Sequence, residues 1–133
     1  MSSVQAQLAA ITKKSMEKAM TVFVRSGIRL GDSIIVSSPV DKGFFRNFWN
    51  TEIGRIGYDK SRSEDRSGSQ SREQLHFTFP QAELGDFVTF NNPLPYGKRL
   101  EYDGWSKQAP NGMVRINTAR WDKIVAEEIA RVK

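Results

Sequence analysis

Residues 91–115 read NNPLPYGKRLEYDGWSKQAPNGMVR, and the interpretation of the chain starts from this stretch. It contains three prolines, three glycines and three aromatic residues. So many turn formers are typical of a disordered linker, but the stretch also carries large side chains that favour burial: Leu94, Tyr96, Leu100, Tyr102, Trp105 and Met113. We therefore expect an ordered loop system, with a short helix near residues 96–102.

The composition predicts one soluble domain spanning residues 1–133. This length suffices for one hydrophobic core and is too short for two. The absence of cysteine excludes disulfides, thiolate catalysis and cysteine-ligated metals, and it suits a reducing cytoplasm. We see no signal peptide and no apolar run long enough to cross a bilayer, so no membrane partner is expected. The net charge of +5 is compatible with anionic partners, but it does not indicate which ones.

Residues 3–36 carry one long helical pattern. Apolar or small side chains recur at three-four spacing along one face: Val4, Leu8, Ile11, Ser15, Ala19, Val22 and Phe23. A helix of this length extends roughly 50 Å, so part of it is expected to pack on something outside the chain. Gly27 and Gly31 interrupt the pattern, and a kink, a close approach by another backbone, and simple tolerance all remain open.

The rest of the chain predicts an α+β fold. Strands are expected within residues 44–56, 75–79 and 87–90, with a brief extended piece at 113–116, which together suggest an antiparallel sheet of about four strands. A final helix is expected to begin at Asn117 or Thr118. Its buried side would carry five apolar residues: Trp121, Ile124, Val125, Ile129 and Val132.

Residues 59–74 contain no apolar side chain. Such a segment has nothing to bury, so it is expected to form a long mobile loop. Its positive and negative charges balance, whereas an arm that binds phosphates would carry surplus positive charge. Nucleic-acid binding by this loop is therefore not favoured.

No residue pattern indicates catalysis. The single histidine, His76, lies in an expected strand without a nearby cysteine or carboxylate pair, and the phosphate-loop, serine-elbow and zinc-protease motifs are absent. A hydrolase that uses Asp41 or Glu101 remains a distant alternative, since nothing in the spacing brings two carboxylates together. We therefore expect a non-enzyme with no cofactor and no metal.

Two segments resemble proteins of the tail completion, or head–tail joining (neck), family of tailed bacteriophages. The residues that match the first motif of this family are Pro39, Val40, Asp41, Gly43, Phe45, Arg46 and Trp49. The residues that match the longer, more specific second motif are Leu94, Pro95, Tyr96, Arg99, Leu100, Glu101, Tyr102, Ser106, Gln108, Ala109, Pro110, Gly112, Met113, Val114 and Arg115. The chain departs from the family where Lys42 replaces threonine, Gly97 replaces alanine and Asp103 is inserted.

The resemblance implies a structural virion protein made in the host cytoplasm and located in the neck or upper tail. It implies a homo-oligomeric ring, expected as a hexamer, that contacts a head-side connector protein and the tail tube, close to packaged DNA but without sequence recognition. The expected interface residues are Arg46, Trp49, Tyr96, Arg99, Glu101, Tyr102, Trp105 and Met113. For Trp105, plugging the domain's own surface and anchoring a partner are equally open. The alternative function is a small basic protein that binds nucleic acid non-specifically through the first helix and the 59–74 loop.

Overall fold

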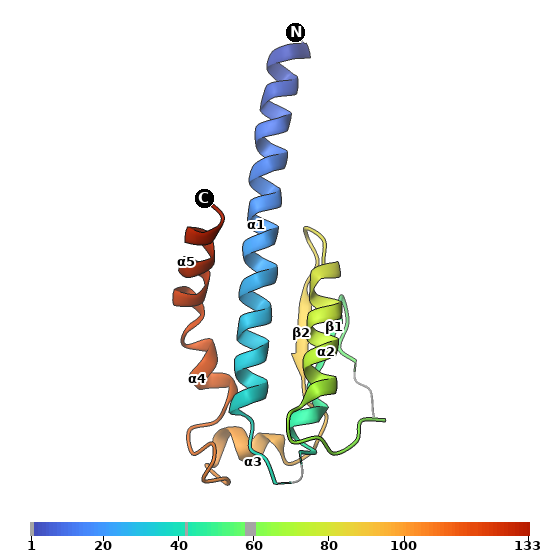
Figure 1. Ribbon diagram of the computed structural model, residues 1–133, viewed down its shortest axis with the longest axis vertical. Helices are drawn as coiled ribbons and strands as arrows, with labels where there is room; N and C mark the ends of the chain where they lie inside the picture. Colours follow the sequence, from blue (N-terminus) through green and yellow to red (C-terminus); the bar gives the residue numbers. More distant parts are fainter. Residues whose placement is uncertain (1, 42, 58–60) are drawn as a thin grey trace.

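A central helix organises the computed structural model, which describes residues 2–41, 43–57 and 61–133. The elements in chain order are α1 (Ser2–Ser37), the 3₁₀ helix η1 (Arg46–Phe48), β1 (Asn50–Ile53), α2 (Ser69–Thr78), the 3₁₀ helix η2 (Phe79–Gln81), β2 (Val88–Asn91), α3 (Gly97–Tyr102), α4 (Val114–Thr118) and α5 (Trp121–Arg131). Helices α4 and α5 lie along one side of α1, while α2 and the two strands lie along another (Figure 1). Helix α3 crosses the base.

The predicted first helix is confirmed, and it is continuous. Gly27 and Gly31 allow close packing within it. A Cβ atom at Gly27 would lie 2.1 Å from Cζ of Phe79, and one at Gly31 would lie 2.6 Å from Cδ2 of Leu75. None of the three open explanations holds as stated: α1 is unbroken, and the groups that approach the two glycines closely are side chains of α2 and η2 rather than another backbone.

The α+β class is confirmed in its coarser form, but the described residues hold two strands rather than about four. Strands β1 and β2 pair antiparallel, from Asn50 opposite Asn91 to Ile53 opposite Val88. The expected strand at 75–79 belongs instead to α2 and η2. Leu75 and Phe79, four residues apart, are both buried, whereas Phe77 is 75% exposed. Two buried side chains four residues apart lie on the same face of a helix. In so short a segment, the same apolar residues also fit the alternation of a strand, so the sequence pattern alone does not separate the two.

The expected extended piece at 113–116 and the expected start of the last helix are also wrong. Residues 114–118 form α4, and α5 begins only at Trp121. Asn117 caps neither helix through its side chain; its Nδ2 donates to the carbonyl oxygen of Met113 and to Oγ of Ser37 at 3.0 Å. This side chain therefore ties α4 to the end of α1.

The hydrophobic core lies between three parts of the chain: α1, the layer formed by α2, η2 and the two strands, and residues 91–113. Its largest side chain is that of Trp49, which is 5% exposed and stacks on Phe90 with ring centroids 4.9 Å apart. The indole N–H of Trp49 donates to Oγ of Ser38 at 2.8 Å, and Ser38 donates to the carbonyl oxygen of Ile34. A buried indole with its N–H satisfied fixes the chain reversal after α1.

The expectation that residues 59–74 bury nothing is wrong. Residues 58–60 lie outside the described part of the chain, but Arg62 and Ser71 are buried and α2 begins at Ser69. The Arg62 guanidinium donates to the carbonyl oxygens of Asn47 and Trp49, at 2.8 and 3.1 Å. Polar hydrogen bonds, rather than apolar burial, hold this segment against the core.

Candidate assembly surface

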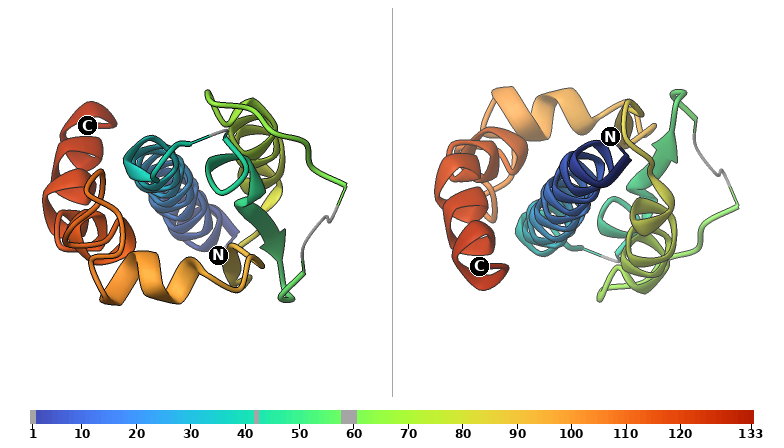
Figure 2. Two further views of the ribbon diagram at one scale, coloured as in Figure 1. Left: turned by 90° about the horizontal axis from the view of Figure 1, so that it is seen from below. Right: turned by 90° about the horizontal axis from the view of Figure 1, so that it is seen from above.

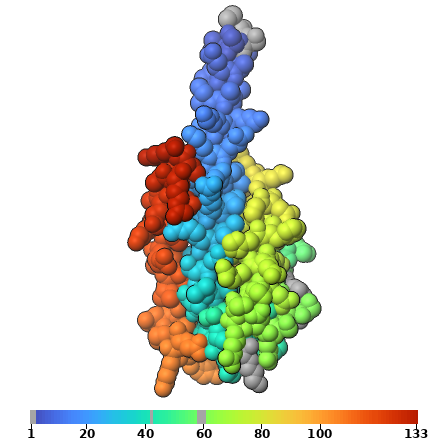
Figure 3. Space-filling model, viewed as in Figure 1, coloured from blue at the N-terminus to red at the C-terminus, as the bar shows by residue number. Residues whose placement is uncertain are grey.

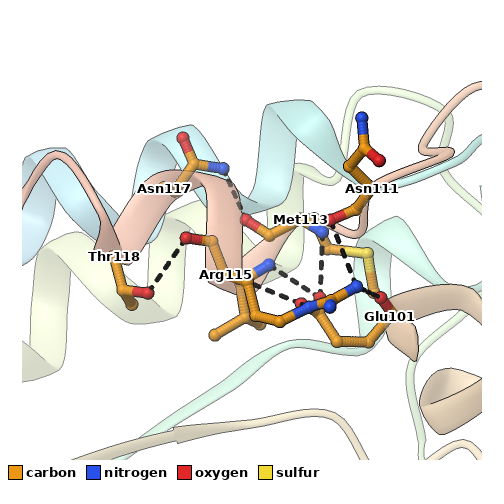
Figure 4. Close-up of polar contacts among 7 residues, drawn as sticks. Glu101, Asn111, Met113, Arg115, Asn117 and Thr118 are labelled. Atoms are coloured by element: carbon orange, nitrogen blue, oxygen red, sulfur yellow. Dashed lines mark hydrogen bonds and ion pairs between the residues drawn. The ribbon is translucent and has the colours of Figure 1, made fainter.

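The carboxylate of Glu101 joins the two halves of the 91–115 stretch (Figure 4). Its Oε1 accepts the backbone N–H groups of Met113 and Val114, at 2.9 and 2.8 Å. Its Oε2 accepts the backbone N–H and the Nε–H of Arg115, both at 2.9 Å. These amides lie at the start of α4, where helical N–H groups have no partner within the helix. We call this arrangement the Glu101 clasp; it closes the base of the 103–112 loop.

The clasp explains why the second motif combines a glutamate with Gly-Met-Val-Arg. Burial alone would raise the pKa of Glu101, but hydrogen bonds from the backbone of Val114, Arg115 and Met113 and from the Arg115 side chain outweigh it and lower this pKa. At Gly112, where φ is +84°, a Cβ atom would lie 2.5 Å from Oε2 of Glu101. Only glycine fits this approach without moving the carboxylate.

The end of α3 and the clasped loop each display one aromatic side chain. Tyr102 is 60% exposed and Trp105 is 59% exposed. An arginine covers a face of each ring: the Arg99 guanidinium carbon lies 5.3 Å from the Trp105 ring centroid, and that of Arg115 lies 4.9 Å from the Tyr102 centroid. Cation–π pairs of this kind at the surface match the composition of protein interfaces.

A cleft of about 450 Å³ lies between the α1–η1 connection and α3 with its following loop. Residues of both motifs line it, among them Asp41, Phe45, Tyr96 and Gln108. The Gln108 side chain fastens its two walls: the Val40 N–H donates to Oε1, and Nε2 donates to the Val40 carbonyl oxygen, both at 2.8 Å. The motifs therefore build a preformed hollow with mainly apolar walls.

The eight expected interface residues divide into three groups. Arg99, Tyr102 and Trp105 are exposed, and Trp105 also forms part of the cleft wall. Tyr96 is half-buried in the cleft, and Arg46 is half-buried while donating to the carbonyl oxygens of Val36, Ser38 and Arg66. Trp49, Glu101 and Met113 are buried inside the chain, so their side chains offer a partner almost no surface.

Of the ten described residues that line the cleft, the expected interface residues include Tyr96 and Trp105 and leave out eight, among them Asp41, Phe44 and Gln108. Asp41 and Gln108 belong to the two motifs, so their membership was the signal that could have identified them. Phe44 lies between motif residues and is 41% exposed, which the sequence pattern does not reveal.

A second exposed surface lies on the N-terminal half of α1, where residues 3–19 are all exposed. Figure 3 shows this half extending past the rest of the molecule. Val4, Leu8 and Ile11 are 53, 60 and 63% exposed. We call these three residues the α1 stripe.

The α1 stripe continues the face of α1 on which α5 packs. Val22, Ser26 and Arg29 each follow one stripe residue by 18 residues, which is about five helical turns. The stripe residues and these three residues therefore lie on the same face of α1. Arg29 donates to Glu127 and Glu128 of α5 at 3.2 and 2.9 Å, and Val22 shares a hollow with Ile129. The same face is thus covered near α5 and uncovered beyond its end.

Within the described ranges, no group of histidine, aspartate and glutamate side chains is placed to hold a metal ion, and no helix is long and apolar enough to span a membrane. His76, expected in a strand, lies on α2 with Nε2 2.8 Å from Oδ2 of Asp32. The relation to phage tail completion proteins stays a prediction from the two motifs. Comparisons with protein families, curated proteins and solved structures return no match to this chain.

Proposed function

We propose that this protein is a structural subunit of a tailed-phage virion, which assembles into a ring, expected as a hexamer, and joins the tail tube to the head-side connector. The phage assignment rests on the two sequence motifs, and the α1 stripe is the structural observation that supports assembly. Its side chains lie beyond the reach of the subunit's own body, and apolar surface of this kind is normally covered by association. A neighbouring subunit or a neighbouring virion protein would cover it.

The cleft and the two arginine–aromatic pairs give the proposal a second support. They lie around α3, at the base of the molecule, whereas the α1 stripe lies toward the N-terminal tip (Figure 1). Two different surfaces allow one copy to contact more than one neighbour. Such heterologous contacts generate rings when the rotation between copies closes.

The test compares substitutions on opposite sides of α1. The double variant Leu8→Glu/Ile11→Glu places charges on the stripe, whereas the matched control Ala6→Glu places one on the far side of the helix. Wild type and Ala6→Glu are expected to form rings with rising concentration in analytical ultracentrifugation, and the double variant is expected to stay monomeric. A tagged wild-type copy should also be located at the neck of purified virions by electron microscopy. A wild-type protein that stays monomeric and is absent from virions would contradict the proposal.

Non-specific nucleic-acid binding is the second candidate function. One observation favours it: the exposed half of α1 carries Lys13, Lys14 and Lys18 against the single acid Glu17. If this helix contacts several phosphates, duplex affinity falls by orders of magnitude between about 50 and 200 mM salt. Ring formation that needs no DNA, together with weak duplex binding at either salt concentration, would favour the assembly role.

A further inference from the structure

The turn after β1 forms a protruding knuckle, which we define as Gly54, Arg55, Ile56 and Gly57. Ile56 is 77% exposed, and the side chain of Arg55 is 72% exposed. Gly54 has a φ of +75° and open space around it, so the chain can turn sharply outward there. The knuckle thus presents one large apolar side chain beside one cation, and the Nε–H of this cation also donates to Oε2 of Glu52 at 3.2 Å.

Hydrogen bonds to the neighbouring strand hold this knuckle in place. The Gly54 N–H donates to the Phe87 carbonyl oxygen at 2.8 Å, and the Thr89 hydroxyl donates to the Arg55 carbonyl oxygen at 2.6 Å. The Asn91 side chain donates to the Gly57 carbonyl oxygen at 3.1 Å. A partner would therefore meet a preformed protrusion, which lowers the entropic cost of binding.

The cleft has the complementary chemistry. Phe44, Tyr96 and Trp105 give it aromatic walls, and among the lining residues that the structure describes, the exposed Asp41 is the one with a charged side chain. An apolar side chain accompanied by a cation matches an aromatic hollow that carries a carboxylate. None of the knuckle residues lines the cleft of its own chain, so a knuckle that fills it must come from another copy.

Other exposed apolar groups suit the cleft less well. Leu84 and Phe87 flank or adjoin the carboxylates of Glu83 and Asp86, which would face Asp41 with like charge. The α1 stripe lies on a whole helix about 10 Å wide, whereas the knuckle offers two side chains on a narrow turn. Charge and shape therefore both favour the knuckle.

We propose that Ile56 of one copy enters the cleft of the next copy, where Arg55 pairs with Asp41. This inference rests on the proposed ring and names one of its contacts. Figure 2 shows β1, which leads into the knuckle, on the side of the molecule away from α4 and α5, whereas the cleft lies between the α1–η1 connection and α3, so the donor and acceptor are different surfaces of each copy. The contact is head-to-tail, as a closed ring requires.

Charge reversal tests the pairing. Arg55→Asp and Asp41→Arg are each expected to raise the concentration needed for assembly by about tenfold or more, because each places like charges together. The double variant Arg55→Asp/Asp41→Arg should assemble at nearly the wild-type concentration. Mixing the two single variants should also restore assembly, because each cleft then meets a knuckle of opposite charge.

Matched controls separate this contact from changes in net charge. Lys123→Asp on α5 and Glu73→Arg on α2 alter exposed charges on helices that do not line the cleft and should assemble like wild type. Ile56→Ser should weaken assembly without lowering the melting temperature of the monomer, because the removed surface is exposed.

Three results would overturn the pairing, and they differ in what they imply for the ring. Single variants that assemble normally, or that fail without rescue in the double variant and the mixture, would place the ring contact elsewhere. Single-variant rings that form but do not join tails would assign the cleft to a neighbouring virion protein. A wild-type protein that never assembles would instead remove the proposed function itself.

Discussion

Replacing Glu101 with glutamine should break half of the Glu101 clasp. The glutamine oxygen can still accept the N–H groups of Met113 and Val114, but its amide nitrogen would point donors at the two N–H donors of Arg115. Two hydrogen bonds to a charged group are lost, each contributing about 1.5–3 kcal/mol. Because the Arg115 side chain is half exposed, hydrogen bonds to water replace part of the lost stabilisation. We therefore expect a loss of about 2–4 kcal/mol in the free energy of unfolding.

Urea unfolding followed by tryptophan fluorescence measures this loss. With a denaturant slope of about 2 kcal/mol per molar, in the middle of the range for small domains, the midpoint should fall by about 1–2 M. Glu73→Gln is the matched control, because Glu73 is exposed on α2, and its effect should stay within about 0.5 kcal/mol. A Glu101→Gln midpoint equal to that of the control at neutral pH would refute the clasp.

The pH dependence gives an independent check. The folded chain holds the pKa of Glu101 below its ordinary value of 4.5, so the ionised clasp contributes its full stability above that pH. This contribution is lost as the pH falls through the lowered pKa, because the folded carboxylate must then be protonated. The stability difference between wild type and Glu101→Gln should therefore shrink below about pH 4.5, and a difference that grows in acid would contradict the assignment.

Three further substitutions test the packing around α1. Gly31→Ala should lower stability by about 1–3 kcal/mol despite its better helix propensity, because the new methyl would lie 2.6 Å from Cδ2 of Leu75; a raised melting temperature would count against this close approach. Ser38→Ala removes the acceptor of the buried Trp49 indole N–H and should cost about 1–3 kcal/mol in urea unfolding, whereas a neutral result would mean that the indole finds another partner. Arg62→Lys cannot reproduce the fork in which Nη1 donates to the Asn47 and Trp49 carbonyls while Nη2 donates to Oε1 of Gln74, so a loss of about 2–4 kcal/mol is expected, and wild-type stability would show that this fork is dispensable.

The sequence predicts the elements whose signals are local. The first helix follows from apolar spacing over many turns, and α3 follows from a short apolar-charged run between turn formers. Strand β2 is likewise found at residues 88–91, where apolar and polar side chains alternate. These assignments needed no knowledge of what each segment packs against.

The failures come from contacts between segments far apart in sequence. In the sequence, Arg62 is one charge in a polar segment and is expected to be solvated. In the structure it donates hydrogen bonds to the carbonyl oxygens of Asn47 and Trp49. Residues 113–116 read as extended, because their conversion to helix depends on the Glu101 carboxylate satisfying the first amides of α4. No window of neighbouring residues contains this information.

The candidate site shows the same division. The two motifs mark the segments that form the cleft, but they do not separate residues that build it from residues that face outward. Glu101 and Met113 belong to the same motif as Tyr102, yet the first two are buried and the third is exposed. Only the folded loop distinguishes them, since the Glu101 clasp turns the motif's polar acid inward.

Helix α1 also has the geometry of a lever arm. The neighbouring elements partly bury α1 from about residue 20 onward, whereas residues 3–19 are exposed over a length of about 25 Å. A rotation of about 10° at the partly buried end would carry the tip through about 4 Å. Small adjustments in the seating of α2 or α5 are thereby magnified into side-chain-sized displacements at the N-terminus.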